Sequence, residues 1–408
     1  MTLAHATSTG SRLPDIAALI GRTTAEARPY QHRIIHKGLS SYLEKALRSV
    51  MIESPTGSGK TIMGLLIAKG LQTVFPDLEI GWISMRRNLL GQAEKENKLK
   101  NINARIKFIS MFEKNLPPEL LLTFPDGSKN PHAARRRMLI IDEAQHDAAN
   151  SMASIHSRVQ PQYILGMTAT PFRTDHVKLC FDCVLKDAGL ASLIKEGYLA
   201  QYRHFTVPRW NVREVCTHYL RSPETWGASI MYFHRIEECM NAATLLLHHG
   251  VAAEVVTGSS DRYAQIDRFM SGETSVLINC MVLTEGFDAP RLQTVFCRPS
   301  CKGVTIQMCG RAFRKYLNAD GTPMLKQIVQ AKKGWPFIKL ATPAEQYVWK
   351  QDKDNPKVGD WLSLVVNPHI NELTCKMLQA LASTRCELPA FITNGMMKTR
   401  GRARRRRI

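Results

Sequence analysis

The sequence predicts an α/β protein with two tandem domains, each built around a parallel β-sheet. Short apolar runs alternate with longer helical patterns, and this alternation occurs twice along the chain. Strands that alternate with helices form βαβ units, which give parallel sheets. The chain has 408 residues, of which 44% are hydrophobic, so it can bury the cores of two or three domains.

The first alternation occupies the amino-terminal half. Four apolar or β-branched runs are expected to be strands: residues 50–52, 80–84, 138–141 and 163–167. A glycine-rich turn and an apolar helix, residues 61–71, follow the first of these strands. We expect this first domain to span residues 25–200, after an amino-terminal extension of residues 1–24.

The alternation starts again in the second half. The expected strands are residues 229–233, 253–256, 275–279 and 294–297. Three helices are expected beside these strands. The first follows residue 233 and ends near residue 248, and the others span residues 261–270 and 304–313. We expect the second domain at residues 201–335, joined to the first through residues 198–223. An accessory region, residues 336–397, and a basic tail, residues 398–408, complete the predicted organisation.

The charge balance indicates a polyanionic partner. Lysine and arginine number 55 against 35 acidic residues, which gives a net charge of +20. Such an excess attracts nucleic acid or an anionic membrane surface. No apolar run reaches the roughly 18 residues of a spanning helix, and the amino terminus does not resemble a secretory signal. We therefore expect nucleic acid as the partner, no membrane, and a cytoplasmic location.

Cysteines and the carboxyl-terminal region leave alternatives open. Cys180 and Cys183 form a C-x-x-C, and Cys297 and Cys301 a C-x-x-x-C, but neither has a partner pair at zinc spacing. We expect reduced, buried thiols instead of a zinc site. The basic tail carries seven lysines and arginines, which either contact phosphates or only solvate the chain end. Two roles are open for three tryptophans, which are expected either to pack in a core or to stack on bases: Trp335, Trp349 and Trp361.

The sequence SPTGSGKT at residues 54–61 carries the strongest chemical signal. It follows a strand and opens a helix, which is the context of a P-loop that wraps phosphates with backbone N–H groups. Lys60 is expected to reach the β- and γ-phosphates of ATP, and the Thr61 hydroxyl to bind Mg²⁺. The loop residues expected to contact nucleotide are Thr56, Gly57, Ser58, Gly59, Lys60 and Thr61.

A second signal is the apolar strand that ends in Asp142 and Glu143. At the carboxyl end of a parallel strand, these acids face the same crevice as the P-loop. Asp142 is expected to hold Mg²⁺ through water, and Glu143 to polarise the attacking water as a general base.

The P-loop and the DEAQ sequence at residues 142–145 together resemble motifs I and II of superfamily 2 helicases of the DExH type. The resemblance implies two RecA-like domains that bind ATP and Mg²⁺ between them. Gln145 stands where the family usually has His or Asp, a position that couples the domains, and His146 is adjacent. Further resemblances run in family order from about residue 25 to 320.

These further motifs supply the remaining candidate residues. By resemblance, Arg28 and Gln31 read adenine, whereas Thr168 and Thr170 of motif III couple hydrolysis to nucleic-acid contact. Gly286 and Asp288 of motif V approach the nucleotide. Nucleic-acid contacts are implied for Arg86, Arg87, Gln92, Arg173 and Thr284.

Motif VI, QMCGRAFR at residues 307–314, supplies Gln307, Arg311 and Arg314. A guanidinium from a second domain stabilises the charge that develops on a transferred phosphoryl group. Arg311 and Arg314 lie three residues apart on an expected helix, so both are expected to face the P-loop.

The forms of motifs Ia and VI are similar to those of the bacterial RadD and phage UvsW type of DNA helicase. This resemblance implies unwinding or branch migration of forked or junction DNA, with partners in replication, recombination or repair. Three alternatives stay open: an RNA helicase, an ATP-gated nucleic-acid clamp that does not unwind, and the motor subunit of a nuclease complex.

Overall fold

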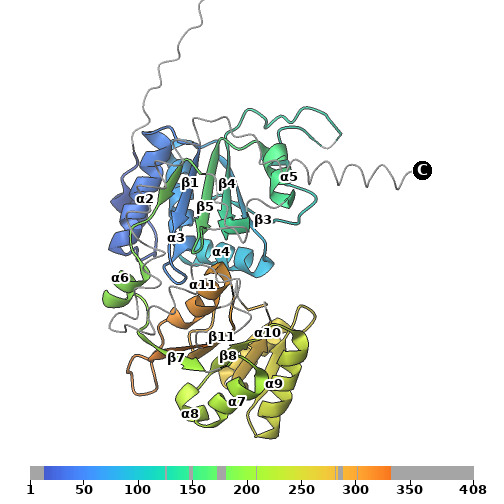
Figure 1. The fold of residues 1–408 in the computed structure, drawn as a ribbon. Coiled ribbons are helices and arrows are strands. Elements are labelled where there is room, and N and C mark those ends of the chain that lie inside the picture. The colour runs from blue at the N-terminus through green and yellow to red at the C-terminus, as the bar shows by residue number, and fades with distance from the viewer. Residues whose placement is uncertain are drawn as a thin grey trace, which may run out of the picture.

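The computed structural model describes residues 13–331, apart from 125, 147–149, 172–180, 208, 281, 284–287 and 301. The chain forms two α/β domains in tandem, and each is built around a six-stranded parallel sheet. Figure 1 shows the first sheet in the upper half of the molecule and the second below it, with α11 (Lys302–Gly310) between them.

The first sheet has the strand order β3-β2-β4-β5-β1-β6. Its strands are β1 (Ser49–Glu53), β2 (Glu79–Ser84), β3 (Lys107–Ser110), β4 (Arg137–Asp142), β5 (Tyr163–Thr168) and β6 (Cys183–Leu185). The helices around it are α1 (Ile16–Gly21), α2 (Pro29–Leu43), α3 (Lys60–Val74), α4 (Arg87–Leu99), α5 (Asn150–Val159) and α6 (Leu190–Lys195), with 3-10 turns at Pro118–Leu120 and Ala144–His146.

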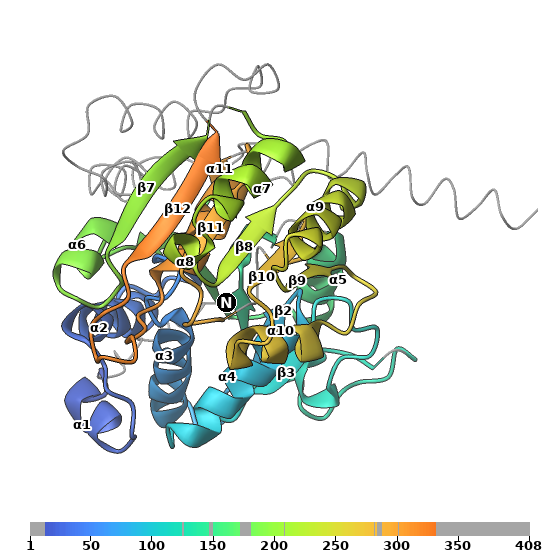
Figure 2. The ribbon, with the colours of Figure 1, turned by 90° about the horizontal axis from the view of Figure 1, so that it is seen from below.

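The second sheet has the order β7-β12-β11-β8-β10-β9, which can be followed across Figure 2. Its strands are β7 (Tyr202–Val207), β8 (Ser229–Tyr232), β9 (Ala253–Val256), β10 (Val276–Asn279), β11 (Thr294–Cys297) and β12 (Lys326–Ala331). Its helices are α7 (Val212–Leu220), α8 (Pro223–Trp226), α9 (Ile236–His248), α10 (Arg262–Ser271) and α11, followed by a 3-10 turn at Arg311–Phe313.

Both sheets are buried on their two faces, as parallel sheets covered by helices must be. Strands β4, β8, β10 and β11 are buried almost throughout. On one face of the first sheet, α3 approaches so closely that a Cβ on Gly64 would lie 2.7 Å from the Met167 sulfur and 3.1 Å from the Trp82 ring. This packing fixes the first turn of α3, and with it the P-loop, against the centre of the sheet.

The segment 198–223 is not the simple connection that the sequence predicts. It contains β7, which pairs in parallel with β12 at the edge of the second sheet, and α7. The partner of β7 lies more than a hundred residues later in the chain, so no local pattern indicates the pairing. Strands β3, β6 and β12 are also additions to the predicted set.

Several expectations fall outside the described residues. They concern the amino-terminal end before residue 13, the accessory region 336–397, the basic tail 398–408, the three tryptophans, and Cys180 and Cys301. Within the described part, no helix is long and apolar enough to cross a membrane.

Candidate active site

The P-loop adopts a turn that only glycine accommodates without strain. Gly57 has a φ of 85° and Gly59 a φ of 79°, both in the left-handed region. A Cβ on Gly59 would collide with the Gln31 amide, and one on Gly57 would lie 2.9 Å from Leu199 and 3.5 Å from an Arg314 guanidinium nitrogen. The glycines therefore let the loop close over the start of α3, with residues of other motifs packed directly on it.

Lys60 opens α3 and turns back into the loop. Its Nζ donates hydrogen bonds to the carbonyl oxygens of Ser54, at 3.1 Å, and Pro55, at 3.3 Å. Burial lowers the pKa of Lys60, whereas the nearby Glu143 and Asp142 carboxylates act in the opposite direction. The ammonium group is thus held at the base of the loop, next to the two acids that end β4.

Gln31 lies against the P-loop backbone. Its Nε2 donates to the Ser58 carbonyl at 2.8 Å, and its Oε1 accepts from the Arg28 backbone N–H at 2.8 Å. The hydroxyl of Tyr30 donates to the same Ser58 carbonyl at 2.5 Å. The Arg28 guanidinium stacks over the ring of Tyr198, 4.9 Å from its centroid. The adenine-reading role of Arg28 and Gln31 stays a prediction, but the structure places both beside the loop.

Motif II combines an acidic pair with a strained backbone. Asp142 ends β4, and its Oδ1 accepts from the Glu143 N–H at 3.0 Å. Glu143 has a φ of 55°, a conformation that costs energy for a residue with a side chain and that concentrates at functional sites. The backbone N–H of His146 donates to the Glu143 carbonyl at 3.0 Å, which closes the 3-10 turn after the acids.

Gln145 connects motif II to motif III. Its Nε2 donates to Glu143 Oε2 at 3.0 Å, and its Oε1 accepts from the Thr168 hydroxyl at 2.6 Å. The Thr168 hydroxyl in turn accepts from the Thr170 N–H at 2.9 Å. A glutamine can therefore bridge the two motifs at the place where the family usually has His or Asp, and it orients the Glu143 carboxylate without being titratable itself.

A cleft between the two domains brings the predicted residues together. It encloses about 650 Å³ of space, part of which is open to solvent. The first domain lines it with Thr56, Gly57, Gly59, Lys60, Thr61, Leu89, Gln92, Glu96, Asp142 and Glu143, and the second with Asp288, Arg311 and Arg314. The composite site that motifs I, II and VI predict thus places Arg311 in the same cleft as Asp142 and Glu143, which precede it by more than 160 residues.

The donors of this cleft suit a nucleoside triphosphate with magnesium. Loop N–H groups and the amino end of α3 favour phosphates. Thr61 and Asp142 present a hydroxyl and a carboxylate, the oxygen ligands that Mg²⁺ prefers. When bound, magnesium would neutralise charge on the β- and γ-phosphates. The residues of the cleft therefore fit both a nucleoside triphosphate and Mg²⁺.

Motif VI corrects one expectation. Helix α11 ends at Gly310, Arg311 starts a 3-10 turn, and Arg314 has extended backbone, so the two arginines do not share one α-helix. Both nevertheless line the cleft. Arg311 is 8% exposed and Gln307, on α11, 7% exposed. The Arg314 Nε lies 2.9 Å from Asp288 Oδ1, so motif V holds this guanidinium by an ion pair.

The turn after motif VI is anchored to the end of the first domain. The Phe313 carbonyl accepts from the Ala200 N–H at 3.0 Å, and Lys315 Nζ donates to the Gly197 carbonyl at 2.6 Å. These bonds tie the arginine-bearing segment to the chain that leaves the first domain.

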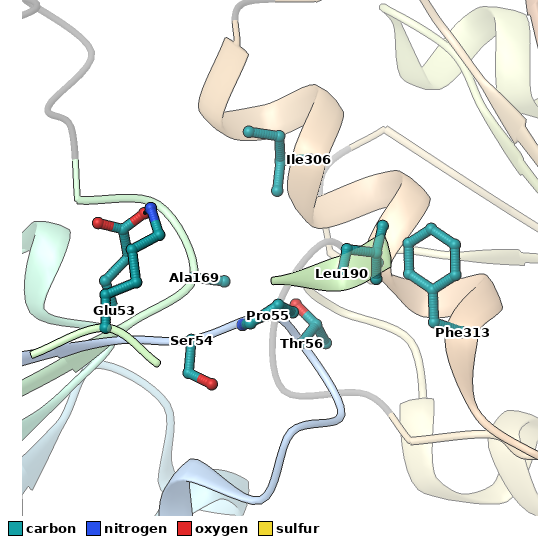
Figure 3. Close-up of a pocket in the computed structure, with 10 residues that line it drawn as sticks. Glu53, Ser54, Pro55, Thr56, Ala169, Leu190, Ile306 and Phe313 are labelled. Carbon is teal, nitrogen blue, oxygen red and sulfur yellow. Dashed lines mark hydrogen bonds and ion pairs between the residues drawn. The ribbon is translucent and has the colours of Figure 1, made fainter. Parts of the chain in front are cut away.

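A second cavity, of about 420 Å³, lies beside the P-loop between the domains. In Figure 3, Ile306 and Phe313 approach it from the second domain, opposite Pro55, Thr56 and Ala169 of the first. A buried ion pair between Glu53 and Lys186, 2.5 Å apart, forms another part of its wall. Residues of both domains therefore meet in this cavity next to motif VI.

One close contact across this interface leads to a prediction. A Cβ on Gly310 would lie 2.8 Å from Thr56 Oγ1 and 3.0 Å from Thr56 Cβ. Gly310→Ala is therefore expected to hold motif VI away from the P-loop and to lower ATP turnover about 10²-fold, the typical cost of a 1 Å misplacement. Steady-state ATPase rates measure this. The control is Gly303→Ala on the same helix, where a Cβ meets nothing within 4 Å; equal rates in both variants would contradict the contact's importance.

The predicted nucleic-acid residues divide into three groups. Arg87 is exposed at the start of α4, whereas Arg86 Nη1 donates to the Val282 carbonyl of the second domain at 3.1 Å. Gln92 lies in the wall of the nucleotide cleft, which differs from its expected place on a nucleic-acid surface. Three expected site residues fall outside the described residues: Arg173, Thr284 and Gly286.

Sequence reasoning missed Glu96. This residue faces the nucleotide cleft from α4, four residues after Gln92. In the sequence, only its i, i+4 spacing from Gln92 indicates that Glu96 shares a helix face with a predicted site residue. A single acid on a polar helix usually faces solvent, so this spacing alone does not predict a place in the cleft. Only the docking of the second domain reveals its position.

Two family models match the chain over these same two domains. The model of the type III restriction enzyme res subunit matches residues 24–173, and that of the helicase conserved C-terminal domain matches residues 211–316. The first contains the P-loop and motifs II and III, and the second contains motifs V and VI.

Curated relatives and solved structures agree with this division. "Putative ATP-dependent helicase IRC3" of Saccharomyces cerevisiae is 26% identical over 45% of this chain and 32% of its own length. "Putative mitochondrial ATP-dependent helicase irc3" of Schizosaccharomyces pombe is 25% identical over 73% of this chain and 56% of its own length. This chain thus spans between 32% and 56% of the length of these relatives.

A fragment of a "putative HsdR subunit of a type I restriction enzyme" from Vibrio vulnificus YJ016 shares the fold, with a TM-score of 0.55 and 21% identity over 78% of this chain and 67% of that one. The two sheets are therefore tandem RecA-like domains, as the sequence predicts. Residues 24–173 and 211–316 thus match the two domains of a superfamily 2 helicase, which are those of a nucleic-acid-dependent ATPase.

Proposed function

We propose that this protein is an ATP-driven motor that moves on DNA and acts on forked or junction DNA in replication, recombination or repair. The observation that carries the proposal is the interdomain cleft, where Lys60, Asp142 and Glu143 face Arg311 and Arg314. A site built from two domains changes when the domains move, so hydrolysis and movement are mechanically linked.

The chemistry follows from the positions of these groups. Lys60 and the loop N–H groups hold the phosphates of ATP, and Glu143, oriented by Gln145, accepts a proton from the attacking water. Arg311 and Arg314 stabilise the charge that develops on the γ-phosphate. The bridge from Glu143 through Gln145 to Thr168 connects this step to motif III, whose family role is nucleic-acid coupling.

Nucleic acid is proposed to run over the exposed ends of both domains, contacted by Arg87 and by motif V. Backbone contacts of this kind do not read sequence and weaken with salt. The motif forms that resemble RadD and UvsW support DNA over RNA, as does the match to a restriction-enzyme subunit. The cytoplasmic location stays a prediction, and the fission-yeast relative is named as mitochondrial.

One assay separates the substrate classes. ATP hydrolysis is measured with single-stranded DNA, duplex DNA, forked DNA, four-way junctions and RNA at fixed salt. Strongest stimulation by forks and junctions supports the proposal. Stimulation by RNA alone would replace it with an RNA helicase, and tight ATP-dependent binding without turnover would replace it with a clamp.

Lys60→Ala is expected to reduce nucleic-acid-stimulated hydrolysis about 10²- to 10³-fold, because one preorganised donor to the phosphates is lost. The fold should be retained, since the hydrogen bonds of the Lys60 ammonium group go to loop carbonyls. Lys69→Ala is the matched control, because this lysine lies on the same helix and its Nζ bonds the distant Asn103 carbonyl. Retained turnover in Lys60→Ala would remove the P-loop from the mechanism.

A second candidate is a motor subunit that works beside a nuclease. The matches to restriction-enzyme subunits favour it. Within the described residues, no group of three or more His, Cys, Asp or Glu side chains could hold a metal ion. Purified protein that cleaves no DNA alone, but supports ATP-dependent cleavage with an added nuclease subunit, would favour this reading over an independent helicase.

A further inference from the structure

Strand β12 begins with a lysine that is fully buried, Lys326. Figure 2 shows this strand inside the second sheet, between β7 and β11. The ammonium nitrogen of Lys326 donates to the carbonyl oxygens of Pro290 and Leu292, both at 2.6 Å. Burial lowers the pKa of Lys326 to about 8, and among the described residues no carboxylate forms an ion pair with it. A buried cation of this kind costs free energy of folding that an apolar side chain would avoid.

The two carbonyls that accept from this ammonium group belong to a tight turn directly after motif V. The Leu292 N–H donates to the Ala289 carbonyl at 3.0 Å, which closes the turn. Pro290 lies two residues after Asp288, the acid whose Oδ1 is 2.9 Å from Arg314 Nε. The ammonium group therefore fixes the chain immediately beyond the acid that holds this arginine.

The same ammonium group also meets the segment that follows motif VI. It lies 5.8 Å from the centroid of the Tyr316 ring, within cation–π range, and Tyr316 comes two residues after Arg314. The Met324 sulfur is 3.4 Å from Lys326 Nζ, and the Met324 N–H donates to the Tyr316 carbonyl at 2.8 Å. The chain beyond each member of the Asp288–Arg314 pair thus contacts one side chain.

Arg314 lies against the P-loop without a helix to hold it. Its backbone is extended, directly after the 3-10 turn Arg311–Phe313. A Cβ on Gly57 would be 3.5 Å from the Arg314 Nη1 and 3.8 Å from its Cδ. A small displacement of the segment after motif VI therefore changes how this guanidinium meets the loop.

We propose that Lys326 is a positioning residue that holds the segments after motifs V and VI together and so keeps the Asp288–Arg314 pair directed at the P-loop. This inference rests on the proposed function for the part that Arg314 takes in hydrolysis. Lys326 is not among the residues that line the nucleotide cleft. Its loss should therefore lower the rate of hydrolysis and leave the affinity for nucleotide, which Lys60 and the loop provide, nearly unchanged.

Lys326→Met tests the proposal because it removes the ammonium group and keeps an unbranched side chain. We expect kcat at saturating ATP and DNA to fall about 10- to 10²-fold, up to the cost of a 1 Å misplacement. The Kd of a fluorescent, non-hydrolysable ATP analogue should change less than about twofold, as for an interaction that acts in the transition state. A normal kcat, or a loss that appears in Kd instead of kcat, would overturn the proposal.

Gln327→Met is the matched control. Gln327 follows Lys326 on β12, is also buried, and its Nε2 donates to the Thr225 carbonyl at 3.0 Å, so this variant likewise removes a buried donor to a backbone carbonyl. Successive strand residues point to opposite faces, which directs this side chain away from the turn after motif V. Its kcat should be normal, whereas equal losses of kcat in both variants would show a general structural effect and overturn the proposal.

A double-mutant cycle with Asp288→Asn tests the route of the effect. In the Asp288→Asn background, Lys326→Met should lower kcat further by less than about twofold, because both changes act on one ion pair. Losses that multiply would overturn the proposal. The melting temperature of each variant is measured beside kcat. If Lys326→Met does not fold, Lys326→Gln, whose side chain is one atom shorter and carries no charge, replaces it under the same criteria.

These measurements separate the inference from the proposed function. If DNA stimulates no hydrolysis in the unaltered protein, the motor function fails, and the rate without DNA still compares Lys326→Met with Gln327→Met. If DNA stimulates hydrolysis but these two variants have the same kcat, the motor function stands and the positioning role of Lys326 fails.

Discussion

Arg311→Ala is expected to lower the maximal rate of ATP hydrolysis by at least about 10³-fold, the lower end of the loss that follows removal of an arginine finger. Arg311 comes from the second domain, lines the cleft opposite Lys60, and is 8% exposed. A factor of 10³ corresponds to about 4 kcal/mol of transition-state stabilisation. Steady-state ATPase assays at saturating ATP and nucleic acid measure it.

The matched control for this variant is Arg213→Ala, which removes an exposed arginine from α7 of the same domain. It should retain normal turnover. Arg311→Lys should restore little, because an ammonium group cannot replace the fork of donors that a guanidinium presents to phosphate. If Arg311→Ala hydrolysed ATP at the rate of the control, the second domain would not take part in the chemistry.

Glu143→Gln is expected to lower the maximal rate about 10²- to 10⁴-fold while nucleotide binding persists. The amide cannot accept a proton from water, but it can keep an interaction with Gln145, so the bridge to Thr168 is preserved. Hydrolysis rates and analogue binding, measured on the same preparation, separate loss of the base from loss of the site.

Glu113→Gln, which changes an exposed acid of the same domain, should leave both quantities unchanged. A Glu143→Gln protein that fails to bind nucleotide would point to the strained turn instead of the base. Normal turnover in this variant would require another proton acceptor in the cleft.

The parts of this site that follow from the sequence are those encoded by contiguous residues. The loop at residues 54–61 needs its glycines locally, and the acids after β4 end a strand that the sequence identifies. Parallel strands place their carboxyl ends on one edge, so these two motifs had to meet. The ion pair between Arg314 and Asp288 also joins two motifs that the sequence marks.

The parts that the sequence does not predict depend on contacts between distant segments. Strand β7 is identified only through its pairing with β12, and Gln92 and Glu96 line the cleft together with residues of the second domain, which lie nearly 200 residues later in the chain. Arg311 and Arg314 were expected on one helix, because the pattern continues through Gly310 without a break. The structure instead tightens there into a 3-10 turn, which aims both guanidinium groups at the P-loop from a short segment.

Nucleic acid is proposed to control ATP hydrolysis in a site that the two domains share. The most direct measurement is the ATPase rate of the unaltered protein with and without saturating DNA, beside Glu143→Gln and Arg311→Ala under the same conditions. We predict a low rate alone, a steep rise with DNA, and no rise in either variant. A rate that is equal with and without nucleic acid, or that survives both substitutions, would contradict the account.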